Sequence, residues 1–207
     1  MGKIGIMGGT FDPIHNGHLM LGEQAYREYG LDEVWYMPSG HPPHKKNHHV
    51  TEPVMRFEMT KLAVKGHKGL FCSDFEVRRS GSTYTAQTLS LLRRSYPEDT
   101  FYFIIGADSL YEIENWYEPG LVLTQAVILA ARRKYEEVDQ DQAMDRQISY
   151  LVKKYGADIR MLHCEKMDIS SAGLRQMIAR GQSVAEFVPE EVLSYISAHG
   201  LYREAET

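Results

Sequence analysis

Short runs of apolar residues alternate along this chain with longer segments in which apolar positions recur every three to four residues. Continuous short runs are typical of buried strands, and the longer periodic segments are typical of amphipathic helices. The runs predict strands at residues 3–7, 34–37, 70–75, 101–105, 127–131 and 159–163. The periodic segments predict helices at residues 15–29, 53–64, 83–95, 139–155, 172–180 and 189–199. This alternation predicts an α/β fold in which helices cover both faces of a parallel sheet.

Length and composition fit one globular domain. The chain has 207 residues, of which 43% are hydrophobic and 25% are charged, so it can bury a sizeable core unaided. We therefore expect a Rossmann-like, doubly wound parallel sheet in a single domain over residues 1–207, with residues from about 181 to 207 as a small C-terminal helical extension. Cys72 and Cys164 lie in apolar runs and are expected to be reduced core residues.

Charge and targeting patterns narrow the class of protein. The first residues lack a signal-peptide pattern, and no run of about 18 apolar residues occurs, so we expect a cytoplasmic protein with no membrane span. The formal net charge of −5 argues against general binding of nucleic acid. A site for an anionic small molecule would have to be locally basic.

A segment rich in glycine and histidine joins the first predicted strand to the first predicted helix. It begins with Gly8-Gly9 and places His15 and His18 three residues apart at the helix start. Glycine lets backbone approach a ligand closely, and a helix N-terminus favours phosphate through its free N–H groups and dipole. The same residues also fit a tight turn with two surface histidines. A zinc site is a further alternative, although no acidic or cysteine partner is spaced to complete it.

The run from Gly8 to Pro13, followed by His15-Asn16-Gly17-His18, resembles the signature of the nucleotidyltransferases with a His-x-Gly-His motif. Over about residues 3–180, the order of further motifs resembles that of the bacterial nicotinate-nucleotide adenylyltransferases. These motifs are Pro42-Pro43-His44-Lys45, Tyr84-Thr85, Ile105-Gly106-Ala107-Asp108-Ser109, Trp116-Tyr117, Ile169-Ser170-Ser171 and Leu174-Arg175. The resemblance implies an enzyme of NAD biosynthesis that transfers AMP from ATP to nicotinate mononucleotide, giving deamido-NAD and pyrophosphate.

The resemblance also implies roles for individual residues. His15, His18 and Arg175 are expected to act in catalysis. ATP is expected to contact Gly8, Gly9, Thr10, Phe11, His18, Gly106, Asp108, Ser170 and Arg175. Nicotinate mononucleotide is expected to contact Thr10, His15, Lys45, Tyr84, Thr85, Trp116, Tyr117 and Arg133. Mg²⁺ is expected to arrive with ATP, held by substrate oxygens and water rather than by the protein.

Residue chemistry leaves plainer interpretations open at several of these positions. Ser170 could simply cap a helix, although Arg175 in the first turn of that helix is unfavourable without a bound anion. Asp108 could also be a helix cap, and Trp116-Tyr117 could be core aromatics. Lys45 could be a solvated loop residue. Metal capture and plain exposure are the two alternatives for the histidines of the loop at 38–51, which are His41, His44, His48 and His49.

The chain departs from the family pattern at two places. Ala172 stands where the family usually has threonine, and Arg133-Lys134-Tyr135 stands where it often has Arg-Pro-Gly, so Arg132 stays an alternative to Arg133. Competing functions are adenylyl transfer to nicotinamide mononucleotide or phosphopantetheine, a non-catalytic nucleotide sensor, and a class I aminoacyl-tRNA synthetase fragment. The last lacks support because no Lys-Met-Ser-Lys-Ser loop occurs. The expected partners are small-molecule substrates, with further copies of this chain as an alternative.

Overall fold

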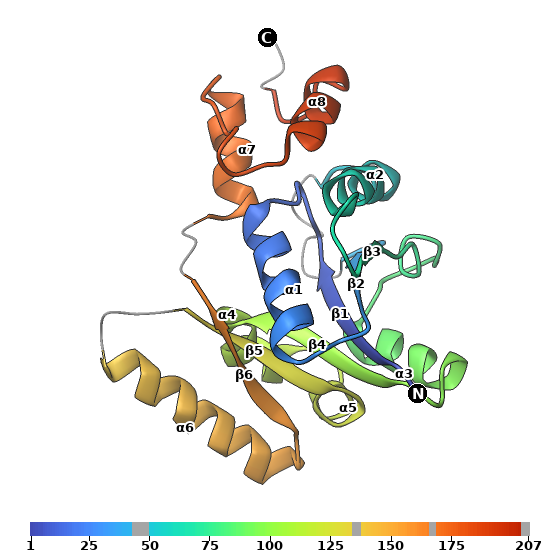
Figure 1. The fold of residues 1–207 in the computed structure, drawn as a ribbon, viewed down its shortest axis with the longest axis vertical. Helices are drawn as coiled ribbons and strands as arrows, with labels where there is room; N and C mark the ends of the chain where they lie inside the picture. Colours follow the sequence, from blue (N-terminus) through green and yellow to red (C-terminus); the bar gives the residue numbers. More distant parts are fainter. Residues whose placement is uncertain (43–49, 134–137, 166–168, 204–207) are drawn as a thin grey trace.

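The computed structural model describes residues 1–42, 50–133, 138–165 and 169–203 (Figure 1). Within these residues the strands form one sheet in the order β3-β2-β1-β4-β5-β6, and every pairing is parallel. The strands are β1 (Lys3–Gly9), β2 (Glu33–Pro38), β3 (Leu70–Cys72), β4 (Thr100–Gly106), β5 (Val127–Arg133) and β6 (Ile159–Cys164). The predicted doubly wound fold is confirmed, because the strand order reverses direction between β1 and β4.

Helices cover both faces of the sheet (Figure 1). One core cluster joins the sheet to α1 (Asn16–Glu28), α2 (Pro53–Val64), α7 (Ser171–Ala179) and α8 (Glu190–Ala198). The other joins it to α3 (Thr85–Ser95), α4 (Ala107–Glu112), α5 (Pro119–Gln125) and α6 (Val138–Tyr155). Along β4, Tyr102 and Ile104 belong to the first cluster, whereas Phe103 and Ile105 belong to the second. Burial on both faces is why the strands read as continuous apolar runs.

The third strand is shorter than predicted. β3 ends at Cys72, so the prediction of strand at residues 73–75 was wrong. β3 lies at one edge of the sheet, where only residues 70–72 pair with β2. Beyond it the chain turns, and the backbone N–H of Arg78 donates to the carbonyl of Asp74 at 3.0 Å. The apolar run itself ends at Cys72, because Ser73 and Asp74 follow it, and the strand ends with it.

Three short helical elements were not predicted. They are α4, the 3-10 helix η2 (Ile113–Asn115) and α5, none longer than seven residues. Periodicity over two turns or fewer does not separate a helix from a loop, which explains why the pattern missed them. These elements nevertheless carry the chain from the end of β4 past the switch point of the sheet.

The C-terminal helices lie beyond the carboxyl end of β1 (Figure 1). They share a core cluster with α1 and α2, so the extension packs on the same face as the first helix. Cys72 and Cys164 are both free, on β3 and β6 at opposite edges of the sheet. In the described part of the chain, no helix combines the length and apolarity needed to cross a membrane.

Candidate active site

Two hollows open where β1 and β4 end, which is the switch point of the sheet. The first, about 340 Å³ in volume, is called here the histidine hollow, and the second, about 270 Å³, the aromatic hollow. The histidine hollow is lined by residues that include His15, His18, Gly106, Asp108 and Ser170. The aromatic hollow is lined by residues that include Gly9, Thr10, Tyr84, Thr85, Trp116 and Tyr117. Gly8, Phe103, Ser109 and Trp116 line both hollows, so the two adjoin.

His15 and His18 lie stacked at the start of α1. Their ring centroids are 3.7 Å apart and their planes differ by 25°. The backbone N–H of His15 donates to Nδ1 of His18 at 3.3 Å. Because Nδ1 accepts, the proton of a neutral His18 ring sits on Nε2. The ring therefore keeps an N–H donor on the nitrogen that the helix start does not use.

Burial keeps both imidazoles neutral at neutral pH. It lowers the pKa of His15 to about 4, and it lowers the pKa of His18 well below 6.5, to which the nearby His15 adds. His15 is only 5% exposed, and its Nδ1 has no hydrogen-bond partner among the described residues. A buried polar atom without a partner is uncommon and marks a position where a ligand or water can supply the bond.

Phe11 supports the histidines from inside the core. Its ring is 2% exposed and meets the His18 ring edge-on, with centroids 5.0 Å apart and planes at 85°. Phe11 has a φ of +51°, in the left-handed region that bulky residues rarely adopt. Phe11 lines neither hollow, so its expected contact with ATP stays a prediction.

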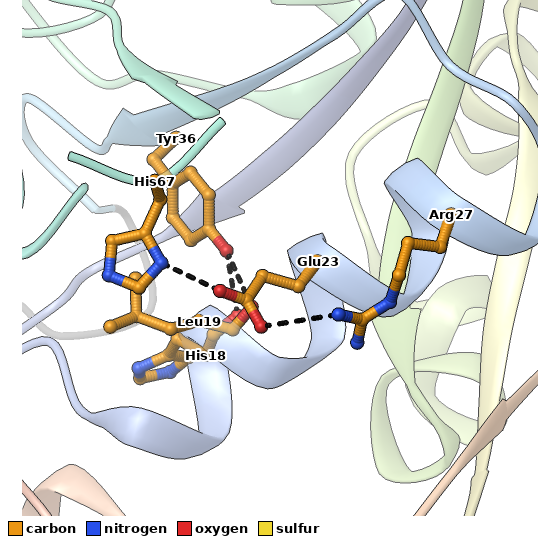
Figure 2. Close-up of polar contacts among 6 residues, drawn as sticks. All are labelled: His18, Leu19, Glu23, Arg27, Tyr36 and His67. Atoms are coloured by element: carbon orange, nitrogen blue, oxygen red, sulfur yellow. Dashed lines mark hydrogen bonds and ion pairs between the residues drawn. The ribbon is translucent and has the colours of Figure 1, made fainter. Parts of the chain in front are cut away.

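The first turn of α1 is held by a side chain of β2 (Figure 2). The hydroxyl of Tyr36 donates to the carbonyls of His18 at 3.0 Å and Leu19 at 3.1 Å. A Cβ atom on Gly22 would lie 2.0 Å from that hydroxyl, so only glycine leaves room for it. On the next turn, Glu23 accepts from His67 at 2.6 Å, as Figure 2 also shows. Residues outside the sequence motifs therefore hold the backbone that carries the His18 ring.

Trp116 and Tyr117 border the aromatic hollow. Trp116 is half-buried and meets Phe103 edge-on at a centroid distance of 6.1 Å. Tyr117 is 45% exposed and lies over Tyr84 with centroids 4.5 Å apart, so it is not a core aromatic. Thr85 begins α3, and the free N–H groups of that first turn therefore lie at the wall of the hollow.

Gly106 and Asp108 end β4 and open α4 at the histidine hollow. A Cβ atom on Gly106 would meet no described atom within 4 Å, so the backbone there is open to close approach by a ligand. Asp108 is exposed in the first turn of α4. Both residues line the histidine hollow, and their expected contacts with ATP stay predictions.

Ser170 caps the start of α7, whereas Arg175 lies in the second turn of that helix and faces a different hollow, so the expectation that Arg175 lies in the first turn was wrong. Ser170 caps the helix by accepting from the backbone N–H of Gly173 at 3.1 Å, so the helix-cap interpretation is confirmed, and it also lines the histidine hollow. Arg175 instead lines a third, C-terminal hollow with Asp12 and Tyr202. Its guanidinium donates to the carbonyl of Asp12 at 2.7 Å. The structure brings Arg175 to the histidine loop but not into the hollow that the histidines line.

Arg56 is a site residue that sequence reasoning missed. It is 1% exposed, and burial lowers its pKa while the nearby Asp12 partly offsets that effect. Its guanidinium donates to four backbone carbonyls at 2.7–3.1 Å, those of Thr10, Ser39, Gly40 and Thr51. It thereby ties together the loop after β1, the loop after β2 and the residues before α2. Nothing in its sequence position marks this role.

Glu76 was also missed. It is 8% exposed in the wall of the aromatic hollow and accepts from the hydroxyl of Thr88 at 2.6 Å. Arg79 in turn donates to that hydroxyl at 3.0 Å. Burial raises the pKa of Glu76. An acidic group in this wall means that an anionic substrate must be oriented with its charges directed elsewhere.

Several predicted positions fall outside what the structure describes. Lys45, His44, His48 and His49 lie outside the described residues, and of Arg132 and Arg133 only the backbone is described, at the end of β5. Among the described residues, no group of three or more histidine, cysteine, aspartate or glutamate side chains could hold a metal ion.

Comparison with known proteins identifies the family of this chain. The cytidylyltransferase-like family matches residues 6–177, from β1 into α7. A protein of Lachnoclostridium phytofermentans named "probable nicotinate-nucleotide adenylyltransferase" is 45% identical over 202 residues, which cover 98% of this chain and 100% of that protein. The chain belongs to the nicotinate-nucleotide adenylyltransferase family. A member of the same name from Clostridium tetani is 34% identical and covers 98% of this chain and 100% of that protein.

Solved structures agree with the fold of this adenylyltransferase. Two structures of Plasmodium falciparum nicotinic acid mononucleotide adenylyltransferase, complexed with APC and with NaAD, superpose with TM-scores of 0.77 and 0.80. Each covers 98% of both chains at 20% sequence identity. At that identity the likeness shows the fold, while membership of the family comes from the sequence relatives.

Proposed function

We propose that this adenylyltransferase transfers AMP from ATP to nicotinate mononucleotide, giving deamido-NAD and pyrophosphate. The observation that carries the proposal is the pair of adjoining hollows at the switch point, which meet at Gly8, Ser109 and Trp116. A reaction that joins two nucleotides needs two such sites with a shared wall. Family membership supports the same activity.

ATP would occupy the histidine hollow. The neutral rings of His15 and His18, the first turn of α1 and the open backbone at Gly106 all offer N–H donors or close approach to phosphate. Ser170 lines the same hollow, and Asp108 could accept from ribose hydroxyls. Arg175, one turn further along α7, would reach the phosphates from the C-terminal hollow, since its bond to Asp12 uses only some of its five N–H groups.

Nicotinate mononucleotide would occupy the aromatic hollow. Trp116 supplies a ring face for stacking on the pyridine, with Tyr84 and Tyr117 beside it. The N–H groups that begin α3 at Thr85 are suited to a carboxylate, in contrast to the acidic Glu76 in the same wall. Lys45 and Arg133 remain predicted partners of its phosphate, and Thr10 is predicted to contact both substrates.

The reaction needs alignment and charge neutralisation rather than a general base. The second pKa of the attacking 5′-phosphate is about 6, so that group is already ionised at neutral pH. It would attack the α-phosphorus in line. Pyrophosphate would leave as the bond breaks between the α-phosphorus and the oxygen that bridges it to the β-phosphorus. His18, through Nε2–H, and His15 would donate to the α-phosphoryl oxygens as charge builds there. Phosphate beside the rings would also raise their pKa values and strengthen these bonds.

Mg²⁺ would enter with ATP and neutralise charge on the phosphates. The carboxylates of Asp108 and Glu165 line the histidine hollow and are suited to hold the water ligands of the Mg²⁺ ion.

Three further points remain predictions from the sequence. They are a cytoplasmic location, association with further copies of the chain, and one functional domain over residues 1–207.

An acceptor assay with magnesium ATP tests the proposal. Pyrophosphate release is measured with nicotinate mononucleotide, nicotinamide mononucleotide or phosphopantetheine as acceptor. We expect the highest kcat/KM with nicotinate mononucleotide and product of deamido-NAD mass. Preference for either other acceptor would replace the substrate assignment, and binding of ATP with no turnover would favour the nucleotide-sensor alternative.

A further inference from the structure

The end of the chain returns to the loop that carries the two histidines. After α8, Tyr202 packs against the core cluster that α2 and α8 share, and its hydroxyl donates to Oδ1 of Asp12 at 2.6 Å. The two residues are 190 positions apart in the sequence. Asp12 is 2% exposed and precedes His15 by three residues. The C-terminal extension therefore contacts the reacting loop itself.

Both ends of this contact have unusual backbone conformations. Tyr202 has a φ of +63°, and Phe11, the neighbour of Asp12, has a φ of +51°. A residue with a side chain is strained in this left-handed region and stays there only when surrounding contacts over-determine it. The described chain has three non-glycine residues with positive φ, and two of them lie at this hydrogen bond. Tyr202 donates it, and Phe11 precedes its acceptor, Asp12.

Asp12 connects the contact to other parts of the site. Its Oδ2 accepts from the backbone N–H of Thr51 at 3.2 Å, and its carbonyl accepts from Arg175 at 2.7 Å. The hydroxyl of Ser171 donates to the next carbonyl along the loop, that of Pro13, at 2.9 Å. The first two turns of α7 are therefore attached to two consecutive residues of the loop. Asp12 thus holds both Tyr202 and Arg175 at the loop that leads to the histidines.

We propose that Tyr202 is a positioning residue for adenylyl transfer, which through Asp12 sets the placement of Arg175 relative to His15 and His18. Tyr202 lines neither the histidine hollow nor the aromatic hollow, so it acts through Asp12 and not on substrate. The inference rests on the proposed function of this site. A misplacement of about 1 Å can cost about 10²-fold in rate. One lost hydrogen bond in a network that keeps its other members should cost less, about 10-fold in kcat.

Tyr202→Phe tests the proposal because it removes the hydroxyl and keeps the ring. We expect kcat to fall about 10-fold, KM for nicotinate mononucleotide to change less than twofold, and Tm to fall by about 2–4 °C. Tyr195→Phe is the matched control, since it removes a hydroxyl from the same extension, where that ring stacks on His199. The control should keep the wild-type kcat. A Tyr202→Phe enzyme with wild-type kcat and a lowered Tm would show a structural role only and overturn the proposal.

A double-mutant cycle supplies the second measurement. Asp12→Asn keeps the size of the side chain, and its effect on kcat should overlap with that of Tyr202→Phe, so that the double variant loses little more than the larger single loss. Strictly multiplicative losses would mean that Tyr202 acts elsewhere and would overturn the proposal. A wild-type chain that releases no pyrophosphate would overturn the proposed function and the role of Tyr202 with it. An active wild type with an unaffected Tyr202→Phe variant would overturn the role of Tyr202 alone.

Discussion

One contact at the residue scale decides which nitrogen of His18 can face a phosphate. Nδ1 accepts the backbone N–H of His15, which leaves the proton of the neutral ring on Nε2. Burial lowers the pKa values of both rings, so the free enzyme keeps them uncharged at neutral pH and avoids repulsion from the positive end of α1. Under the proposed function, both rings would act as neutral donors in the free enzyme, and a bound polyanion would raise their pKa values.

Replacing His18 with alanine should reduce kcat by about 10²–10³-fold, because a positioned donor to developing charge is worth about 3–4 kcal/mol. Steady-state pyrophosphate release measures this loss, and circular dichroism and Tm check that the fold is kept. His163→Ala is the control, since that ring lies on β6 with a side chain 71% exposed. An unchanged kcat would remove the His18 ring from the mechanism.

The lowered pKa of His15 predicts a loss of stability in acid. The pKa is about 4 in the folded protein and 6.5 as the reference value, so between these pH values the unfolded chain takes up a proton that the folded ring does not. The free energy of unfolding should therefore be highest above pH 6.5 and fall by up to about 1.4 kcal/mol per pH unit down to pH 4 from this group alone.

Urea unfolding of the wild type and of His15→Gln from pH 7.5 to 4.5 measures that contribution. The variant should show the shallower decline towards acid, because it lacks the proton uptake on unfolding. His199→Gln, at an exposed position after α8, should follow the wild type. Parallel curves for wild type and His15→Gln would contradict the assignment of a neutral, buried ring.

At the scale of elements, α1 is placed by the strand beneath it. Tyr36 on β2 binds two carbonyls in the first turn of α1, and Gly22 on the next turn leaves space for its hydroxyl. Arg56 on α2 does the same for the loop after β1 and for both ends of the segment between β2 and α2, by donating to their carbonyls. The loop that carries His15 and His18 thus owes its position to polar groups of neighbouring elements that line neither the histidine hollow nor the aromatic hollow.

Gly22→Ala should destabilise the enzyme by several kcal/mol and lower kcat, because the new Cβ would lie 2.0 Å from the Tyr36 hydroxyl. Adding Tyr36→Phe should recover part of the stability only, since the ring carbon Cζ would still lie 2.7 Å away. Gly120→Ala in α5 is the matched control. Its Cβ would meet nothing closer than 3.6 Å, so the change should be neutral or stabilise by up to about 1 kcal/mol. Equal Tm values for both alanine variants would contradict this account.

At the scale of the whole molecule, both hollows are supported from far along the chain. The C-terminal extension contacts Asp12, and α6 contacts the turn that carries the aromatic pair. Glu114 on η2 accepts from Lys154 at 2.7 Å and from Tyr155 at 2.9 Å, both at the end of α6. Hydrogen bonds from these groups lower the pKa of Glu114. Trp116 follows Glu114 by two residues, so this contact orients one wall of the aromatic hollow.

Lys154→Met should raise KM for nicotinate mononucleotide about 2–5-fold, because the lost contact with Glu114 loosens the turn that carries Trp116. The effect should be modest, since an exposed ion pair contributes little to stability, and KM for ATP should stay unchanged. Lys153→Met makes the same change in charge and composition one residue earlier, at an exposed position, and should leave both KM values as in the wild type. Equal effects of the two variants on both substrates would point to net charge rather than to the contact with Glu114.

Local pattern was sufficient for most elements, while the phosphate site that it indicated at the first loop stays a prediction. Apolar runs predicted the positions of all the strands in the sheet, with an error only at the edge strand β3, where pairing ends early. The glycines and histidines indicated a phosphate site because a helix start favours anions whatever surrounds it. Short helices at 107–125 escaped because too few turns were present to show a period.

The sequence by itself determined a doubly wound α/β fold, since strand burial depends on near neighbours in the chain, and its motifs indicated a nucleotidyltransferase by their resemblance to that family. Phosphate binding at the end of the first strand stays a prediction. Only the tertiary structure decided that Arg175 is bound to Asp12, that Tyr202 holds the same residue, and that Arg56 joins the loop after β1 to the segment between β2 and α2. Arg175 lies 163 residues from Asp12 and Tyr202 lies 190 residues from it, and pairings at that separation follow from how layers pack, which no local pattern encodes.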